Sequence, residues 1–192
     1  MRSPFNYIVT TENRYNNKIG DLVVNTEITE RDAIFVNRVG TIIATPSDSN
    51  FGSLPIGATV IVHHNVFRRM VGMQGKEQNS TSHIEDDKYL VYADQIFAYK
   101  EGKEWKACEG YCFVEPRENE ETFINGHLAL LSGYMRYPDD NLVQQGIKEG
   151  DLVGFSPNSE YEFTIDNQKL YRINSNQIYG YKENATKETR SS

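Results

Sequence analysis

The chain has 192 residues, of which 38% are apolar and 24% charged, and its formal net charge is −7. This length suits one ordinary domain or two small ones. No apolar run approaches the roughly 18 residues needed to span a bilayer, and residues 1–6 lack the features of a signal peptide. The acidic balance disfavours nucleic acid, whose binding starts from basic surface. We therefore expect a cytoplasmic protein with no membrane or nucleic-acid partner.

Twelve tyrosines, many β-branched residues and closely spaced turn signals predict an all-β protein with short strands. No long amphipathic helix pattern is present. In the first half we expect strands at residues 7–10, 39–44, 59–63, 89–92 and 95–99. In the second half we expect them at residues 111–114, 127–131, 151–155, 162–165, 170–173 and 177–181.

The two sets of strands keep the same order, which indicates an internal duplication. YIVT is matched by YCFV, GTIIAT by GHLALL, LPIGATVIV by IKEGDLVGF and QIFAYKE by QIYGYKE. Chance matches between β-rich segments would not be expected to keep four blocks in one order, so we predict two tandem domains. The expected parts are residues 1–101, a linker at 102–108, residues 109–183 and a disordered tail at 184–192.

The first repeat carries a long insertion between its first two strands. There, in ENRYNNKIGDLVVNTEITERDA, polar residues surround the apolar tripeptide Leu22, Val23 and Val24, which Ile19 and Gly20 precede. Such a segment cannot offset the entropy of ordering by itself, and we expect it to be mobile until a partner binds it. The alternative is a hairpin in which residues 22–25 pair with 35–38, and such a hairpin can present the same apolar tip.

Two other segments are expected to be irregular. The second repeat is predicted to be the longer one between its second and third strands, with the extra residues in SGYMRYPDDNLVQQG. In the first repeat, VFRRMVGMQGKEQNSTSH has the composition of a solvated surface loop.

No group of residues indicates a metal or cofactor site. His63 and His64 are adjacent at the end of an expected strand, where neighbouring side chains point to opposite faces, so they are poorly placed to bind one metal. Cys108 and Cys112 lack the second ligand pair of a zinc site.

Enzymatic residues are also not predicted. The aspartate pairs at 86–87 and 139–140 stand in turn contexts and are interpreted as turn formers rather than catalytic carboxylates. The sequence contains no G-x-S-x-G, P-loop or G-x-G-x-x-G motif.

The order of the blocks resembles the GroES co-chaperonin family. The resemblance rests on the early proline in MRSPFNYIV, the long polar loop with its tripeptide, GTIIA, IGATVIV and the ending DDKYLVYADQIFAYKE. It covers residues 4–101 closely and 109–183 more loosely, and it extends to versions that bacteriophages encode. It implies two small irregular β-barrels in a protein that forms a ring, with a heptamer as the first expectation, and caps an ATP-driven chaperonin of the GroEL type.

The resemblance also implies two sets of binding residues. The loop at 11–37 corresponds to the family's mobile loop, in which Ile19, Gly20, Leu22, Val23 and Val24 would contact the chaperonin. Asp21 stands where the family usually has a second glycine. The closing strand of one subunit would pair with the starting strand of its neighbour, which makes QIFAYKE an edge strand. The implied interface residues are Phe5, Tyr7, Gln95, Ile96, Phe97 and Tyr99.

The corresponding segment of the second repeat, EPRENEETFING, is shorter, so we expect only the first repeat to engage the chaperonin. The second would be a spacer, a cap over the cavity or a substitute for a neighbouring subunit. The rival hypothesis is a phage structural or adaptor protein that uses the barrel as an assembly module, because a fold does not fix a function. A viral protein of either kind would act in the host cytoplasm.

Overall fold

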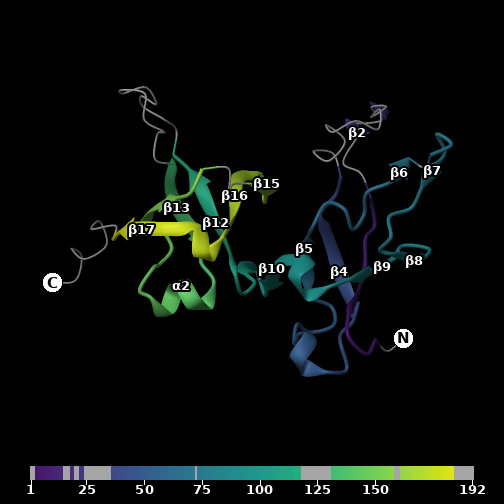
Figure 1. The fold of residues 1–192 in the computed structure, drawn as a ribbon, viewed down its shortest axis with the longest axis horizontal. Helices are drawn as coiled ribbons and strands as arrows, with labels where there is room; N and C mark the ends of the chain where they lie inside the picture. Colours follow the sequence, from purple (N-terminus) through teal and green to yellow (C-terminus); the bar gives the residue numbers. More distant parts are fainter. Residues whose placement is uncertain are drawn as a thin grey trace. The chain divides into compact units, whose positions relative to one another are not determined.

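The computed structural model describes residues 3–14, 18–19, 22–23, 36–71, 73–117, 131–157 and 161–183. Over these residues the chain consists almost entirely of β-strands and their connections (Figure 1). It divides into two compact units, residues 1–104 and 105–192. The predicted all-β fold with two domains is therefore confirmed.

The larger sheet has seven strands, in the spatial order β11, β10, β5, β4, β1, β9 and β8. Their bounds are Glu104–Ala107, Ile96–Glu101, Thr59–Val62, Val39–Ala44, Tyr7–Thr10, Lys88–Val91 and His83–Glu85. Two short pairs stand outside this sheet, β2 (Lys18–Ile19) with β3 (Leu22–Val23) and β6 (Met70–Val71) with β7 (Glu77–Gln78). The 3-10 helices η1 (Ser49–Phe51) and η2 (Ala93–Gln95) precede β5 and β10.

The second unit contains a six-stranded sheet, in the order β15, β16, β12, β13, β14 and β17. Its strands span Tyr161–Ile165, Gln168–Asn174, Tyr111–Pro116, Leu131–Tyr137, Leu152–Phe155 and Ile178–Lys182. The helix α2 (Asp140–Gln144) joins β13 to β14, and η3 (Ser175–Gln177) precedes β17.

Six strands follow the same order in both sheets. β8, β9, β1, β4, β5 and β10 correspond in turn to β15, β16, β12, β13, β14 and β17. The registers agree as well, because β1 pairs with β4 across an irregularity between Ile8 and Val9, and β12 pairs with β13 across one between Phe113 and Val114. The matched blocks of the sequence thus have a counterpart in matched strands.

A pair of glycines confirms this register. A Cβ on Gly40 would lie 2.5 Å from Val9 Cγ1, and a Cβ on Gly133 would lie 2.5 Å from Val114 Cγ1. Each glycine allows the second strand of its repeat to approach the first more closely than a side chain would permit.

The structural match corrects the sequence alignment of GTIIAT with GHLALL. The counterpart of residues 40–44 is 133–137, GYMRY, which lies in a segment expected to be irregular and instead forms most of β13. Residues 127–130 lie outside the described part of the chain. The connection from β1 to β4 spans residues 11–38 and that from β12 to β13 spans 117–130, so the first is twice as long. Between its second and third strands, the second repeat carries no extra residues.

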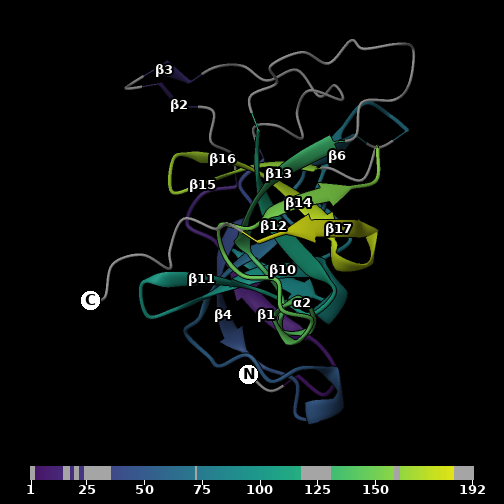
Figure 2. The same cartoon turned by 90° about the vertical axis from the view of Figure 1, so that its left-hand side faces the viewer.

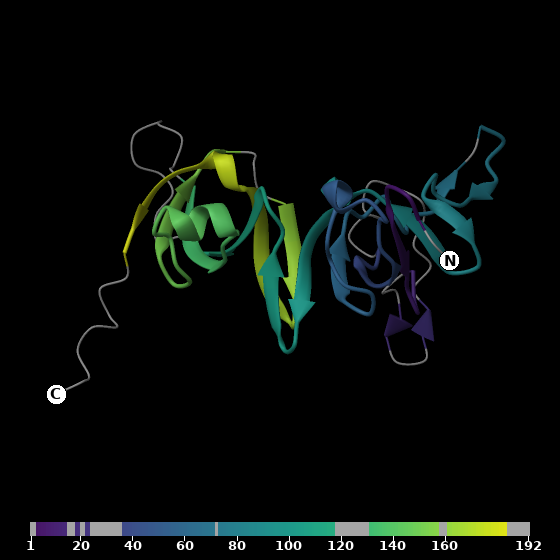
Figure 3. The same cartoon turned by 90° about the horizontal axis from the view of Figure 1, so that it is seen from below.

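The segment expected to be a linker also forms regular structure. The chain turns at Gly102, whose φ of 62° suits glycine, and returns as β11 beside β10 (Figures 2 and 3). Trp105 and Ala107 are buried, whereas Glu104 and Lys106 are exposed, in the alternation of a strand with one covered face. The segment expected to be a solvated loop contains β6, β7 and the start of β8.

Each unit has its own apolar core. In the first unit Ile42 and Val60 are fully buried, and the rings of Phe67 and Tyr89 meet edge to face with centroids 4.9 Å apart. The second core is formed by Cys112, Val114, Met135, Leu142, Ile147, Val153, Phe155 and Ile173. Burial of side chains of this size contributes about 1.5–3 kcal/mol each, so these clusters dominate the stability of the sheets.

Candidate functional site

The residues expected to contact a chaperonin lie in the connection from β1 to β4. Ile19 ends β2, while Leu22 and Val23 form β3. The two strands are antiparallel, with Ile19 opposite Leu22. Gly20, Val24 and most of the predicted loop at 11–37 lie outside the described residues. Part of the connection is therefore a hairpin, and its strand β3 pairs with β2, a partner that the hairpin alternative did not include.

The two ends of this connection are bonded together at a neck, formed by Thr11, Asn13, Arg14, Asn37 and Val39. Asn37 N donates to Arg14 O at 2.8 Å. The Asn37 side chain donates from Nδ2 to Thr11 Oγ1 at 2.9 Å and to Asn13 O at 2.6 Å, and its Oδ1 accepts from Val39 N at 3.0 Å. The connection thus leaves and re-enters the first unit at one fixed point.

Arg14 anchors the neck to the rest of the first unit. Its guanidinium donates from Nε to Phe67 O at 3.3 Å and from Nη1 to Asn79 Oδ1 at 2.8 Å. The guanidinium carbon lies 5.7 Å from the centre of the Tyr89 ring, within the range of a cation–π interaction. These contacts hold the start of the long connection against the buried core.

Sequence reasoning missed the neck. Asparagine and threonine readily bond backbone groups two residues away, and the side chain of Asn37 does so with Val39. This local signal did not indicate that Asn37 would also reach Thr11 and Arg14 across the connection, because that contact depends on the pairing of β1 with β4.

The predicted subunit-interface residues do not form an open edge. β10 lies between β5 and β11, so the expectation that QIFAYKE is an edge strand is wrong. The reason is the turn at Gly102, which returns the same chain along the outer side of β10. Tyr7, Ile96 and Phe97 are 2%, 1% and 4% exposed, Gln95 and Tyr99 are half-buried, and only Phe5 is well exposed at 53%.

The equivalent strand of the second unit does lie at an edge. β17 is last in its sheet, and β14 is its one partner among the described strands. Tyr179 and Tyr181 on β17 are 54% and 44% exposed. An unpaired edge offers backbone donors and acceptors to another strand. Among the described strands, the closing strand with such an edge is that of the second repeat, where the sequence did not place it.

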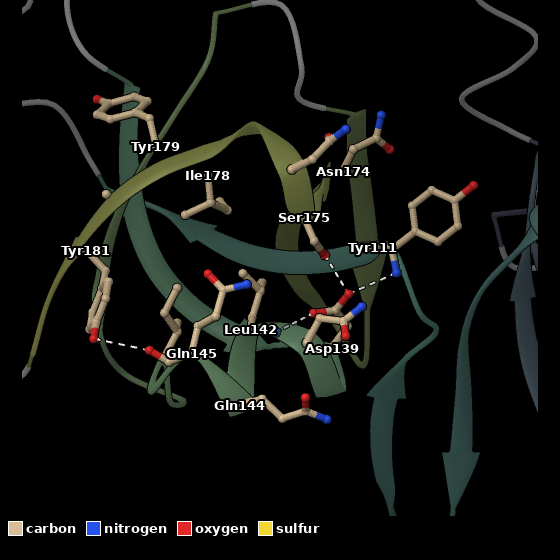
Figure 4. A pocket seen from close by; sticks show the side chains of 15 residues that line it. Tyr111, Asp139, Leu142, Gln144, Gln145, Asn174, Ser175, Ile178, Tyr179 and Tyr181 are labelled. Atoms are coloured by element: carbon tan, nitrogen blue, oxygen red, sulfur yellow. Dashed lines mark hydrogen bonds between the residues drawn. The ribbon is translucent and has the colours of Figure 1, made fainter.

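A pocket of about 1200 Å³ separates β17 from α2 (Figure 4). Leu142, Ile147 and Ile178 give it an apolar surface, and Tyr181 Oη donates to Gln145 O at 3.4 Å at one end. The polar side chains lining it include five amides, from Asn141, Gln144, Gln145, Asn174 and Asn176.

Asp139 is the one carboxylate in this pocket, and its oxygens are already bonded. Oδ1 accepts from Leu142 N at 2.9 Å, as an N-cap of α2, while Oδ2 accepts from Gly110 N at 2.8 Å and Ser175 Oγ at 2.9 Å. The sequence interpretation of Asp139 as a turn former understated its role, because one buried carboxylate joins three segments of the second unit.

The histidine pair differs from its prediction. β5 ends at Val62, so His63 and His64 lie in the following turn, and their rings stack with centroids 4.3 Å apart instead of pointing to opposite faces. Burial, followed by the charges of His63, Arg38 and Arg68, lowers the pKa of His64 to about 4. Within the described part of the chain, no group of three or more His, Cys, Asp or Glu side chains is arranged to hold a metal ion.

The surroundings of the two cysteine thiols disfavour the thiolate form. Burial raises the pKa of Cys108 and the pKa of Cys112 to about 12. Because the thiolate is the form that attacks or binds metal, both side chains act as small apolar residues at and beside β12.

No protein-family model matches this chain, and a search of curated proteins finds no significant match. Among the described residues, no helix has the length and apolar character to cross a membrane.

Proposed function

We propose that the protein is a co-chaperonin, which binds and caps an ATP-driven chaperonin through the apolar tripeptide Leu22, Val23 and Val24. The observation that carries the proposal is the long connection at 11–38, which leaves the first unit through a neck closed by hydrogen bonds. Its counterpart in the second unit is half as long, so one unit of the pair carries the binding element.

The fixed neck gives the connection a mechanical role. Ordering a segment on binding costs about 2–5 kcal/mol, and this cost falls when the ends of the segment are already held. Asn37 and Arg14 hold those ends against the first unit. Each connection would then make a weak, reversible contact, and several connections in one assembly would bind together through effective concentration.

A homo-oligomeric ring would supply that multiplicity. The free edge of β17 supports such assembly, because a strand from another subunit can pair with it. A heptamer remains the first expectation for its size. In this assembly the second unit makes subunit contacts and the first unit makes chaperonin contacts.

The free edge also favours a second candidate, an adaptor or structural protein of a virus particle that assembles through β17. In that case the long connection would have no chaperonin to bind. The two candidates therefore differ in the partner of residues 11–38.

Capture by a GroEL-type chaperonin in the presence of ATP or ADP tests the proposal. The wild-type protein should be retained on the immobilised chaperonin, and the variant Leu22→Ser/Val23→Ser/Val24→Ser should not. Ile56→Ser, at a side chain of the first unit that is 65% exposed, serves as a control for loss of an apolar side chain elsewhere. Circular dichroism establishes that each variant is folded. Retention of the triple variant would exclude the tripeptide, and failure to capture the wild-type protein would favour the adaptor.

A further inference from the structure

A cationic cluster surrounds the turn that follows β5 in the first unit. Val66 N donates to His63 O at 3.0 Å and Asn65 N donates to His63 Nδ1 at 3.1 Å, which fixes the shape of the turn. The His63 ring stacks on His64 and meets Phe97 edge to face, with centroids 5.9 Å apart. The two imidazoles are thereby held at the surface, each half-buried.

Two arginines contribute the charge of this cluster. Arg38 O accepts from Val62 N at 2.8 Å, so Arg38 lies beside the end of β5. Arg38 and Arg68 are both near enough to His64 to help lower its pKa to about 4, after burial and His63. His64 is therefore neutral at neutral pH, and the guanidinium groups carry the positive charge.

The cluster borders the neck of the long connection. Arg38 directly follows Asn37 of the neck, and Arg68 directly follows Phe67, whose carbonyl accepts from Arg14. Arg14 adds a positive charge to the neck itself, where it bonds to Phe67 O and Asn79. The whole chain has a net charge of −7, so these arginines oppose the sign of the molecule as a whole.

Nearby Arg69 contributes less to the field of the cluster. It forms an exposed ion pair with Glu77 at 3.0 Å, so its charge is balanced locally.

Among the described residues of the second unit, the equivalent positions form no such cluster. The registers of β4 with β5 and of β13 with β14 define the equivalent positions. The counterparts of Arg38, His63 and His64 are Leu131, Ser156 and Pro157. Positive charge and the long connection thus occur together in one unit, although both units share the same sheet.

We propose that Arg38, Arg68 and the His63–His64 pair form an anion-binding patch that receives an acidic surface of the protein bound by the long connection. The identity of that protein as a chaperonin rests on the proposed function, whereas the acidic chemistry rests on the patch. Complementary charge chiefly raises the rate of association and fixes orientation. Nucleic acid is the less favoured anion, because the rest of this acidic chain would repel it.

The test measures association and dissociation rates of the full chain on a GroEL-type chaperonin at low and high NaCl. Arg68→Glu and Arg38→Glu should each lower the association rate about 3- to 10-fold at low salt, with little change in dissociation. The difference should largely disappear near 0.5 M NaCl, where charges are screened. Arg117→Glu makes the same charge change at an exposed position after β12 and should have little effect.

The outcomes separate the patch from the proposed function. If the wild-type protein is captured and both variants associate as fast as Arg117→Glu, the patch is excluded and the co-chaperonin proposal stands. If the wild-type protein is not captured, the patch is tested independently of the chaperonin. The protein is titrated with polyglutamate, and NMR monitors the titration. Salt-sensitive shifts at residues 38, 63, 64 and 68 would support an acidic protein partner. The absence of shifts with polyglutamate would overturn the proposal. Shifts that appear with a single-stranded oligonucleotide and not with polyglutamate would also overturn it.

Discussion

The closing strands β10 and β17 have nearly the same sequence, QIFAYKE and QIYGYKE, and equivalent places in their sheets, but their surroundings differ. Phe97 is 4% exposed, whereas its counterpart Tyr179 is 54% exposed. β11 covers the outer side of β10, and β14 is the one partner of β17 among the described strands. The repeated heptapeptide therefore forms a closing strand in both sheets, but the exposure and the pairing of that strand differ.

The connections that follow β1 and β12 also differ between the two units. The first unit has the longer connection, the hydrogen-bonded neck and the arginines beside it, and the second unit has a connection half as long. Cores are shared because they determine the fold, while connections and edges tolerate change and carry function. The unshared parts are therefore where the two units have separate roles.

The largest expected effect distinguishes the connection from β13 to β14, which contains α2, from its counterpart between β4 and β5, which contains η1. Asp139→Ala removes a 1% exposed carboxylate that accepts three hydrogen bonds, and should lower the free energy of unfolding by about 3 kcal/mol. Asp48→Ala, which loses one exposed cap of η1, should cost about 1 kcal/mol. Urea unfolding followed by circular dichroism measures both. Equal losses would show that the Asp139 network adds nothing to a simple cap.

The glycines test whether the cores are equivalent. Gly40→Ala and Gly133→Ala each place a methyl group against a valine of the neighbouring strand, and each should cost about 1–3 kcal/mol. Urea unfolding followed by circular dichroism measures both losses. If one of the two substitutions is tolerated, the two strand crossings are not equivalent.

Hydrogen exchange tests the difference between the closing strands. Among the described strands, the backbone of β10 has a partner on both sides and that of β17 has one on a single side. The amides of β17 that do not face β14 should therefore exchange at least about 10-fold faster than those of β10. NMR-detected exchange at neutral pH measures this ratio in a sample of known mass. Equal protection would mean that another strand covers β17 in solution.

The smallest expected effect is a pH dependence confined to the first unit. Because the pKa of His64 in the folded state is lowered from 6.5 to about 4, the unfolded chain takes up a proton more readily between these values. The stabilisation is therefore fully present above pH 6.5 and is lost as the pH falls towards 4. His64→Gln should reduce this slope, measured by urea unfolding across the range. An unchanged slope would assign the acid sensitivity to other groups. The equivalent Pro157 does not titrate.

The sequence was most informative where strands have a regular pattern and least informative where the contacts are distant. β1 and β4 match their predicted bounds. β13 was missed because GYMRY mixes glycine with polar and aromatic residues and leads into PDD, which is typical of a turn. β11 was missed because EWKA is short and charged, although Trp105 and Ala107 already showed the alternation of a half-buried strand.

The candidate site was only partly predictable for a related reason. The tripeptide at 22–24 is visible as an apolar group in a polar segment, so it could be predicted as a binding element from the sequence alone. The neck, the stacked His63–His64 pair and the bonds of Asp139 join residues that are distant in sequence or past the end of a strand. They depend on which strands become neighbours, and the repeat pattern indicated that order without indicating those contacts.

The most direct test of the central claim exchanges the two connections for flexible linkers, one at a time. In one variant a Gly-Ser linker of equal length replaces residues 15–35, which leaves the neck in place; in the other it replaces residues 118–130. Capture by a GroEL-type chaperonin with ATP or ADP is then measured for both variants and the wild-type protein. We predict that the first replacement abolishes capture and that the second preserves it. Capture that survives the first replacement, or is lost only with the second, would contradict the account.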